Sequence, residues 1–99
     1  MPLKILSLPR ARQDRVDIWL YIAADSLAAA DRLADRLDEV VEVLAEFPES
    51  GSLRPKLGTA IRVFPVENFL ILYRATPDAI EIVRILHAAR DISPELLSD

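Results

Sequence analysis

Apolar residues recur every three or four positions over residues 27–47, for about six helical turns. Most charged side chains of this segment lie off the apolar stripe. Asp25 and Ser26 break the preceding pattern and provide a cap at the start of the segment, and Pro48 stops it. The spacing therefore predicts a helix over 27–47.

The preceding residues, 9–24, are rich in helix formers and contain no glycine. Pro9 suits the first turn of a helix, but Leu8 before it has no side-chain oxygen to cap the helix. The apolar residues that approximate one stripe are Ala11, Ile18, Trp19 and Ile22. These features predict a first helix over 9–24. Because the connection to the next helix is only about two residues long, the two helices are expected to form an antiparallel hairpin.

After Gly58, hydrophobicity alternates instead of following a helical period. Three runs rich in β-branched and aromatic residues cover 60–66, 69–75 and 79–87, with short polar connections between them. Connections of this length predict hairpins, and strands joined by hairpins are antiparallel. Pro65 cannot donate a hydrogen bond within a sheet, so the first of these strands is expected to be an edge strand or to bulge there.

The two ends of the chain complete the predicted fold. Residues 2–8 form a short apolar run that Pro9 stops, which predicts an opening strand. Ser93 and Pro94 have the order of a helix start, with room for only a short helix after them. The order β-α-α-β-β-β with a short C-terminal helical tail predicts a single α+β domain over 1–99. In this domain a helical hairpin packs on one antiparallel sheet.

Composition limits where the protein works and what it binds. The 99 residues include no cysteine, which leaves no disulfide framework and no thiolate metal site and is typical of a reducing cytoplasm. We find no secretory leader and no apolar run long enough to span a membrane, so we expect a cytoplasmic protein without a membrane anchor. The net charge of −4 disfavours a protein that binds DNA or RNA through their phosphates.

The charge is unevenly distributed along the chain. Residues 1–50 hold six Lys and Arg against ten Asp and Glu, whereas residues 51–90 hold six against three. An acidic half and a basic half indicate a dipolar surface with a polar partner on one side. The alternative is that mixed charge only keeps the protein soluble.

No residue pattern identifies a catalytic or cofactor site. The chain has no phosphate-binding glycine loop, no nucleophile elbow, and no zinc-protease or EF-hand motif. Asp35 with Glu39, and Asp38 with Glu42, share a helical face, but no histidine accompanies them. A solvated acidic face is therefore a better interpretation than a metal site. We assign no catalytic residue, no metal and no cofactor.

Basic residues on the predicted strands are the remaining candidates for chemistry. Arg62, Arg74 and Arg84 can converge across neighbouring strands into a guanidinium cluster. Such a cluster suits phosphate or carboxylate recognition, because each guanidinium binds these groups with two parallel hydrogen bonds. The alternative is that each arginine pairs with an acidic residue nearby, the candidates being Glu67, Glu81 and Asp91.

Alternation along the last predicted strand divides its side chains between two faces. It places Arg84 with Ile82 and Leu86 on one face, and Val83, Ile85 and His87 on the other. His87 is the only histidine; it is either a general acid or base near neutral pH or a hydrogen-bonded structural residue. Among the aromatic residues, Trp19 and Tyr21 are candidate anchors for a protein partner, whereas Phe64 and Tyr73 are expected in the core.

Six motifs follow one another along almost the whole chain. They are residues 11–23 (ARQDRVDIWLYIA), 29–33 (AADRL), 44–51 (LAEFPESG), 61–65 (IRVFP), 70–74 (LILYR) and 82–91 (IVRILHAARD). Each motif alone is loose, but the ordered set is specific and resembles the ParE branch of the ParE/RelE toxin superfamily. The fold of that family, a helical hairpin packed on an antiparallel sheet, agrees with the fold predicted from the hydrophobic pattern.

The resemblance implies a toxin of a bacterial type II toxin–antitoxin system. ParE toxins are not enzymes: they poison DNA gyrase, and a cognate ribbon-helix-helix antitoxin of the ParD type neutralises them by wrapping a helix and an extended segment over the toxin. On this interpretation, the candidates for binding the target are Arg62, Arg74, Arg84, His87 and Arg90. The candidates for binding the antitoxin are Trp19, Tyr21 and Pro65.

The RelE branch of the superfamily instead cleaves messenger RNA on the ribosome. By our alignment, Leu70 stands where RelE-like ribonucleases carry an arginine, Ile61 and Val63 lie near their paired lysines, and Leu96 lies near their C-terminal tyrosine. Arg90 is the residue that stays in register. Because leucine supplies neither charge nor a transferable proton, the resemblance favours ParE over RelE. The alternatives are a RelE-like ribonuclease and an inactive family member that only binds an antitoxin.

Overall fold

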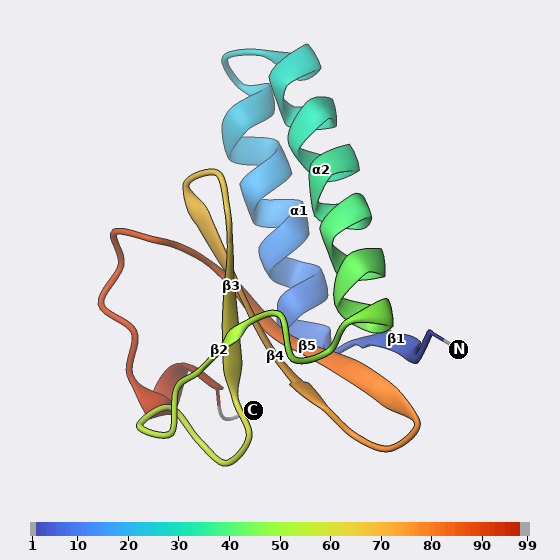
Figure 1. Cartoon of the computed structure of the whole chain (residues 1–99). Coiled ribbons are helices and arrows are strands. Elements are labelled where there is room, and N and C mark those ends of the chain that lie inside the picture. Colours follow the sequence, from blue (N-terminus) through green and yellow to red (C-terminus); the bar gives the residue numbers. More distant parts are fainter. Residues whose placement is uncertain (1, 98–99) are drawn as a thin grey trace.

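The computed structural model describes residues 2–97 and places two helices against a five-stranded sheet (Figure 1). In chain order the elements are β1 (Lys4–Ser7), α1 (Pro9–Ala23), α2 (Leu27–Glu46), β2 (Ser52–Leu53), β3 (Arg62–Val66), β4 (Phe69–Ala75), β5 (Ala79–His87) and the 3₁₀ helix η1 (Pro94–Leu97). The α+β class, the helical hairpin and the three long C-terminal strands are confirmed. The strand β2 was not predicted, because two residues are too few to show an alternating pattern.

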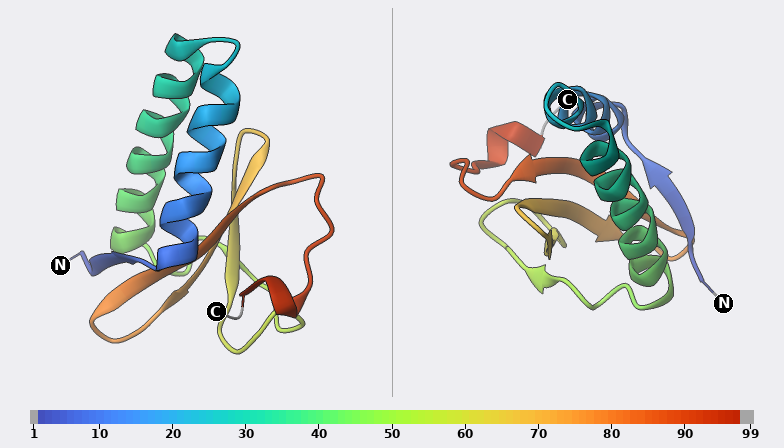
Figure 2. Two further views of the ribbon diagram at one scale, coloured as in Figure 1. Left: turned by 180° about the vertical axis from the view of Figure 1, so that it is seen from behind. Right: turned by 90° about the horizontal axis from the view of Figure 1, so that it is seen from above.

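The ends of both helices follow the sequence closely. Pro9 occupies the first turn of α1, and Leu8 before it makes no side-chain cap. At the start of α2, the backbone N–H of Ala29 donates to Ser26 Oγ at 3.1 Å, which is the predicted cap. The helix ends just before Phe47 and Pro48. The part of the hairpin around the α1–α2 connection projects beyond the sheet (Figures 1 and 2).

The strand order in the sheet is β1-β5-β4-β3-β2. The pairs β5–β4 and β4–β3 are antiparallel, as predicted, and β3 also pairs antiparallel with the unpredicted β2. In contrast, β1 runs parallel to β5, so the sheet is mixed rather than antiparallel throughout. The prediction failed for β1 because only a short hairpin connection forces two strands to be antiparallel. Most of the chain separates β1 from β5, so no local pattern fixes their relative direction.

Pro65 lies where β3 is no longer paired with β2, so the predicted edge is confirmed at Pro65 itself but not for the whole strand, which lies between β4 and β2. The backbone N–H of Arg54 donates to the carbonyl of Ile61 at 2.8 Å, and β2 pairs with β3 only as far as Val63. Because hydrogen-bonding direction alternates along a strand, Pro65 points its backbone nitrogen away from β4, beyond the end of β2. The missing N–H of this proline therefore costs the sheet no hydrogen bond.

A β-bulge occurs in β5 instead of at Pro65. Tyr73 of β4 is opposite Ile82 and the adjacent Leu72 is opposite Arg84, which leaves Val83 without a partner in β4. One extra residue reverses the side-chain alternation after it. Arg84 therefore does not share a face with Ile82, as strict alternation predicted.

Side chains on the two faces of the sheet form two apolar clusters. The larger one lies between the sheet and the helices and includes Leu37, Leu44, Ile71, Tyr73 and Ile82. The smaller one lies on the opposite face, which we call the open face, and consists of Val63, Leu72 and Leu86 with Leu57, Leu70, Ile92, Leu96 and Leu97 packed against them. Residues after β5 thus fold back to cover the open face (Figure 2).

Candidate functional site

Arg84 forms a buried ion pair with Asp14 of α1. Its Nε and Nη2 donate to the two carboxylate oxygens at 2.7 and 2.9 Å, and the side chains are only 6% and 12% exposed. The same carboxylate accepts the backbone N–H of Ile85 at 2.9 Å. Asp14 thus provides a hydrogen-bond acceptor for β5 beyond the point where β1 stops pairing with it. The third nitrogen, Nη1, donates to the carbonyl of Leu96 at 2.7 Å. Hydrogen bonding to Asp14 raises the pKa of Arg84, which keeps the guanidinium charged.

The three strand arginines do not converge into a cluster. Arg62 is opposite Tyr73 on the helix-covered face and donates from Nη1 to the carbonyl of Gly51 at 2.7 Å. Arg74 is on the open face, where its Nε donates to Glu81 at 2.6 Å. The predicted alternative, pairing with a nearby acidic residue, is therefore right for Arg74. Arg84 pairs with a residue of α1 instead, and Arg62 binds backbone carbonyls.

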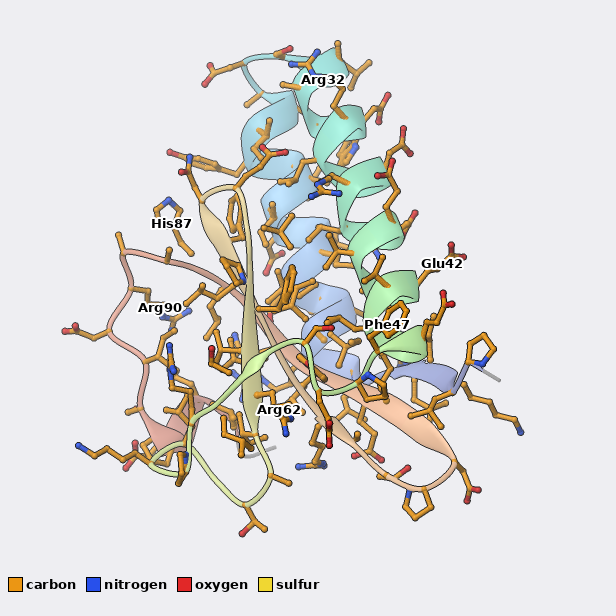
Figure 3. The ribbon with its side chains drawn as sticks, viewed as in Figure 1. Arg32, Glu42, Phe47, Arg62, His87 and Arg90 are labelled. Atoms are coloured by element: carbon orange, nitrogen blue, oxygen red, sulfur yellow. The ribbon has the colours of Figure 1, made fainter. Side chains whose placement is uncertain are left out.

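His87 and Arg90 lie on one side of the molecule, apart from Arg62 (Figure 3). Both are exposed. The His87 ring stands edge-on to Phe69 with ring centroids 5.3 Å apart, and its Nδ1 accepts the backbone N–H of Ala89 at 3.0 Å. Because Nδ1 accepts this bond, the proton of the neutral ring is on Nε2, which faces outward from this contact. The Arg90 guanidinium makes no hydrogen bond or ion pair with residues 2–97.

Tyr73 fixes the turn after α2 onto the sheet. Its hydroxyl donates to the carbonyl of Pro48 at 2.8 Å and accepts the backbone N–H of Gly51 at 2.8 Å. Tyr73 is fully buried, as predicted, and this burial raises the pKa of its hydroxyl. A Cβ at residue 51 would lie 2.7 Å from the Tyr73 hydroxyl and 3.0 Å from the carbonyl of Val63, so glycine is required there by space.

Trp19 lies in a shallow apolar groove between the two helices. The groove has a volume of about 280 Å³, and the residues that line it are Arg15, Val16, Ile18, Trp19, Leu20, Ala30, Leu33, Ala34 and Leu37. Trp19 is half-buried, and its Nε1 donates to Asp31 at 3.0 Å. Tyr21 lies outside this groove and is 80% exposed. Of the two aromatic residues predicted as partner anchors, Trp19 therefore lies in a groove and Tyr21 projects into solvent.

Pro65 lines a second and larger groove, on the open face. Its volume is about 720 Å³, and the residues around it are Ser52, Arg54, Pro55, Lys56, Leu57, Val63, Pro65, Leu70 and Ile92. Arg54 and Lys56 are exposed at this groove. Neither residue was predicted to belong to a site, because both lie in a loop with no alternating pattern, and only the fold brings this loop next to Pro65 and Leu70.

Within residues 2–97, no group of three histidine, aspartate or glutamate side chains is arranged to hold a metal ion. The helices of this region are also too short or too polar to cross a membrane. The acidic residues of α2 that we interpreted as a solvated face are all exposed. Two of them also form ion pairs: Asp38 accepts a hydrogen bond from Arg15 at 2.8 Å, and Glu39 lies 3.5 Å from Arg36. Both pairs are at the surface, where ion pairs contribute little to stability.

Comparison with known proteins identifies the family. Residues 5–92 match the sequence model of the ParE toxin of the type II toxin–antitoxin system parDE. The chain is 40% identical to "Toxin RelE2" of Caulobacter vibrioides over 81 residues, which covers 82% of this chain and 90% of that protein. Among solved structures, a chain of the chromosomal ParDE system from P. aeruginosa aligns with a TM-score of 0.71 at 22% identity, covering 86% of this chain and 95% of that one.

A chain of the toxin–antitoxin complex RelBE2 from Mycobacterium tuberculosis has the same fold, with a TM-score of 0.60 at 23% identity, covering 88% of this chain and 99% of that one. These two structural matches bear on the fold alone, whereas the sequence match spans most of the chain. On that basis, this chain belongs to the ParE toxin family of type II toxin–antitoxin systems.

Proposed function

We propose that this toxin acts by binding DNA gyrase, that it catalyses no reaction, and that a cognate antitoxin holds it inactive. Membership of the ParE family supports a toxin. The choice of gyrase rests on the resemblance to the ParE branch, and the choice of binding over catalysis rests on the open face of the sheet.

The observation that carries the proposal is the apolar character of this open face. Ribonucleases of the RelE type carry basic residues and a tyrosine there, by the alignment given above. In this chain Val63, Leu70 and Leu96 belong to the apolar cluster of the open face, and Ile61 is only 2% exposed. Aliphatic side chains neither transfer a proton nor stabilise the charge that develops when a phosphodiester is cleaved. This arrangement supports binding and disfavours RNA cleavage.

For the surface that meets the target, we propose the side of the molecule that carries His87 and Arg90 (Figure 3). Both side chains are exposed, and the guanidinium of Arg90 is available to a carboxylate or phosphate of a partner. Arg74 remains a candidate contact because its side chain is 42% exposed even when paired with Glu81. Arg62 and Arg84 are bound to groups of the chain itself, so we place them in a supporting role.

For the antitoxin, we propose contacts with Trp19, Tyr21 and Pro65. Trp19 and Tyr21 are on the helical hairpin, whereas Pro65 lines the groove of the open face. One antitoxin chain that touches all three has to pass around the edge of the sheet, with a helix on the hairpin and an extended segment on the far side. The two structural neighbours are toxin–antitoxin systems, which supports a partner of this kind, and we propose the ribbon-helix-helix type.

The test of this proposal is to induce the chain in cells that lack the antitoxin. We expect inhibited supercoiling of a reporter plasmid and DNA breaks, while transcripts stay intact; purified toxin should inhibit gyrase directly. Arg90→Ala should weaken the effect, because it removes an exposed cation from the proposed surface. Arg32→Ala is the matched control, since Arg32 is an exposed arginine near the far end of the hairpin (Figure 3).

Cleaved messages with normal supercoiling would refute the proposal and favour a RelE-like ribonuclease. Two observations keep that second candidate in view: a relative 40% identical is named RelE2, and His87 and Arg90 are exposed close together in the sequence. A chain that binds its antitoxin but inhibits no growth would instead be an inactive family member.

A further inference from the structure

Residues 88–97, which we call the C-terminal segment, lie over the open face and have little regular structure. Residues 88–93 belong to no helix or strand, and η1 is a single short turn. Hydrogen bonds join both ends of the segment to the rest of the chain. At its start, the backbone N–H of Ala88 donates to the carbonyl of Asn68 at 2.8 Å, and those of Ala89 and Arg90 donate to His87 at 3.0 Å each. Near its end, Arg84 donates to the carbonyl of Leu96 at 2.7 Å.

The bond from Arg84 depends on the shape of the guanidinium group. Nε and Nη2 are both used by the carboxylate of Asp14, which leaves Nη1 for Leu96. A planar group with five fixed donors can bind a carboxylate on one side and a carbonyl on another at the same time. A lysine ammonium has one nitrogen, so it retains the charge but not this geometry.

Asp14 holds the arginine in place from a different element. It belongs to α1, and besides Arg84 it binds the backbone N–H of Ile85 in β5. The side chain of Arg84 is therefore fixed between α1, β5 and η1. It crosses the edge of the sheet beyond the last pair of β1 and β5, which joins Ser7 and Ile82. The charge of Arg84 is also stabilised, since its pKa is raised by Asp14.

We propose that Arg84 is a positioning residue for toxicity: through Leu96 it fixes the C-terminal segment, and with it the surface formed by His87 and Arg90, without touching the target itself. This inference rests on the proposed target surface of the preceding section. It reassigns Arg84, which the sequence suggested as a direct contact, because its side chain is 6% exposed and bound by the chain's own groups.

The experiment compares Arg84→Lys with Arg36→Lys, the same exchange at an exposed arginine of α2. The first readout is amide hydrogen exchange of Leu96, whose N–H donates to Ser93 at 3.1 Å. In Arg84→Lys we expect this exchange to become about tenfold faster, the size expected for losing one hydrogen bond from a charged donor. Amides in the centre of α2 should not change. The second readout is growth inhibition without antitoxin, which should fall while antitoxin binding persists.

A second variant keeps the proposal testable if Arg84→Lys does not fold. A chain that ends at Ser93 lacks Leu96 but retains both Arg84 and Asp14, so the ion pair is preserved. It should bind antitoxin and yet lose growth inhibition. Unchanged exchange at Leu96 in Arg84→Lys, or full growth inhibition by either variant, would overturn the inference.

These readouts separate this inference from the proposed function. Hydrogen exchange and growth inhibition do not depend on which target the toxin binds, whereas the supercoiling assay does. If the wild-type chain inhibits growth without affecting gyrase, the choice of gyrase fails and the role of Arg84 is still decided by its own two variants.

Discussion

At the scale of single residues, the Tyr73 hydroxyl gives the sharpest test of the structure. It bridges the carbonyl of Pro48 and the N–H of Gly51 in a fully buried position. Tyr73→Phe leaves both backbone groups without this partner, which should lower the free energy of unfolding by about 1–3 kcal/mol. Urea denaturation measures the change. Tyr21→Phe is the matched control, because Tyr21 is 80% exposed and should be neutral.

The same hydroxyl predicts how stability changes at alkaline pH. Burial raises the pKa of Tyr73 in the folded protein, whereas a tyrosine of the unfolded chain ionises at about pH 10. Above that pH the unfolded chain releases the proton and the folded chain retains it, so the stability from this group is complete below about pH 10 and is lost as the pH rises further. Tyr73→Phe should lose less stability than wild type between pH 9 and 11; an equal loss would contradict this assignment.

Some of these residue environments could be predicted from the sequence and others could not. Tyr73 was predicted in the core, because it lies in an alternating apolar run. The partner of Arg84 was not predicted, since Asp14 is 70 residues away and nearer carboxylates were available in the sequence. Pairing of charges over such a distance is set by the fold, and a composition or spacing argument contains no information about it.

At the scale of elements, the start of α2 depends on one side chain. Ser26 accepts the N–H of Ala29, which otherwise has no partner within the first turn of the helix. Ser26→Ala should therefore destabilise the protein by about 1 kcal/mol, and Ser26→Asp should retain the cap. Thermal unfolding of both variants tests this, with Ser52→Ala of the exposed strand β2 as a control. Equal effects of Ala and Asp at residue 26 would argue against capping.

The helices and long strands were predictable because their apolar periods are strong over many residues. The bulge in β5 was not, because Ile82, Val83 and Ile85 are all apolar and an extra residue leaves such a run looking unchanged. The direction of β1 was also not predictable, since its partner lies at the other end of the chain.

At the scale of the whole molecule, the two grooves are on different sides of the sheet, one between the helices and one on the open face. Trp19 lines the first, and it is the chain's only tryptophan. If the antitoxin covers this groove, water should leave the indole and its fluorescence emission should shift to the blue on binding. Titration of the toxin with antitoxin measures the shift. Subtracting the same titration with Trp19→Phe removes any signal from the partner.

Binding confirmed by calorimetry without a change in Trp19 emission would place the antitoxin elsewhere on the toxin. The sequence indicated these surfaces only through their aromatic and proline residues. Arg54 and Lys56 of the second groove were missed, because a groove is formed by segments that are distant along the chain.

The unpaired Val83 decides on which face of the sheet the later side chains of β5 lie, and this matters when toxin sequences are aligned. Before it, even-numbered side chains such as Ile80 and Ile82 point toward the helices; after it, Ile85 does so and Leu86 points away. In a relative whose last strand pairs regularly here, without the bulge, the arginine would share a face with the residue equivalent to Ile82, beneath the helical layer and out of reach of a carbonyl on the reverse side. Equivalent columns in an alignment therefore denote equivalent surfaces only among toxins that share this interruption.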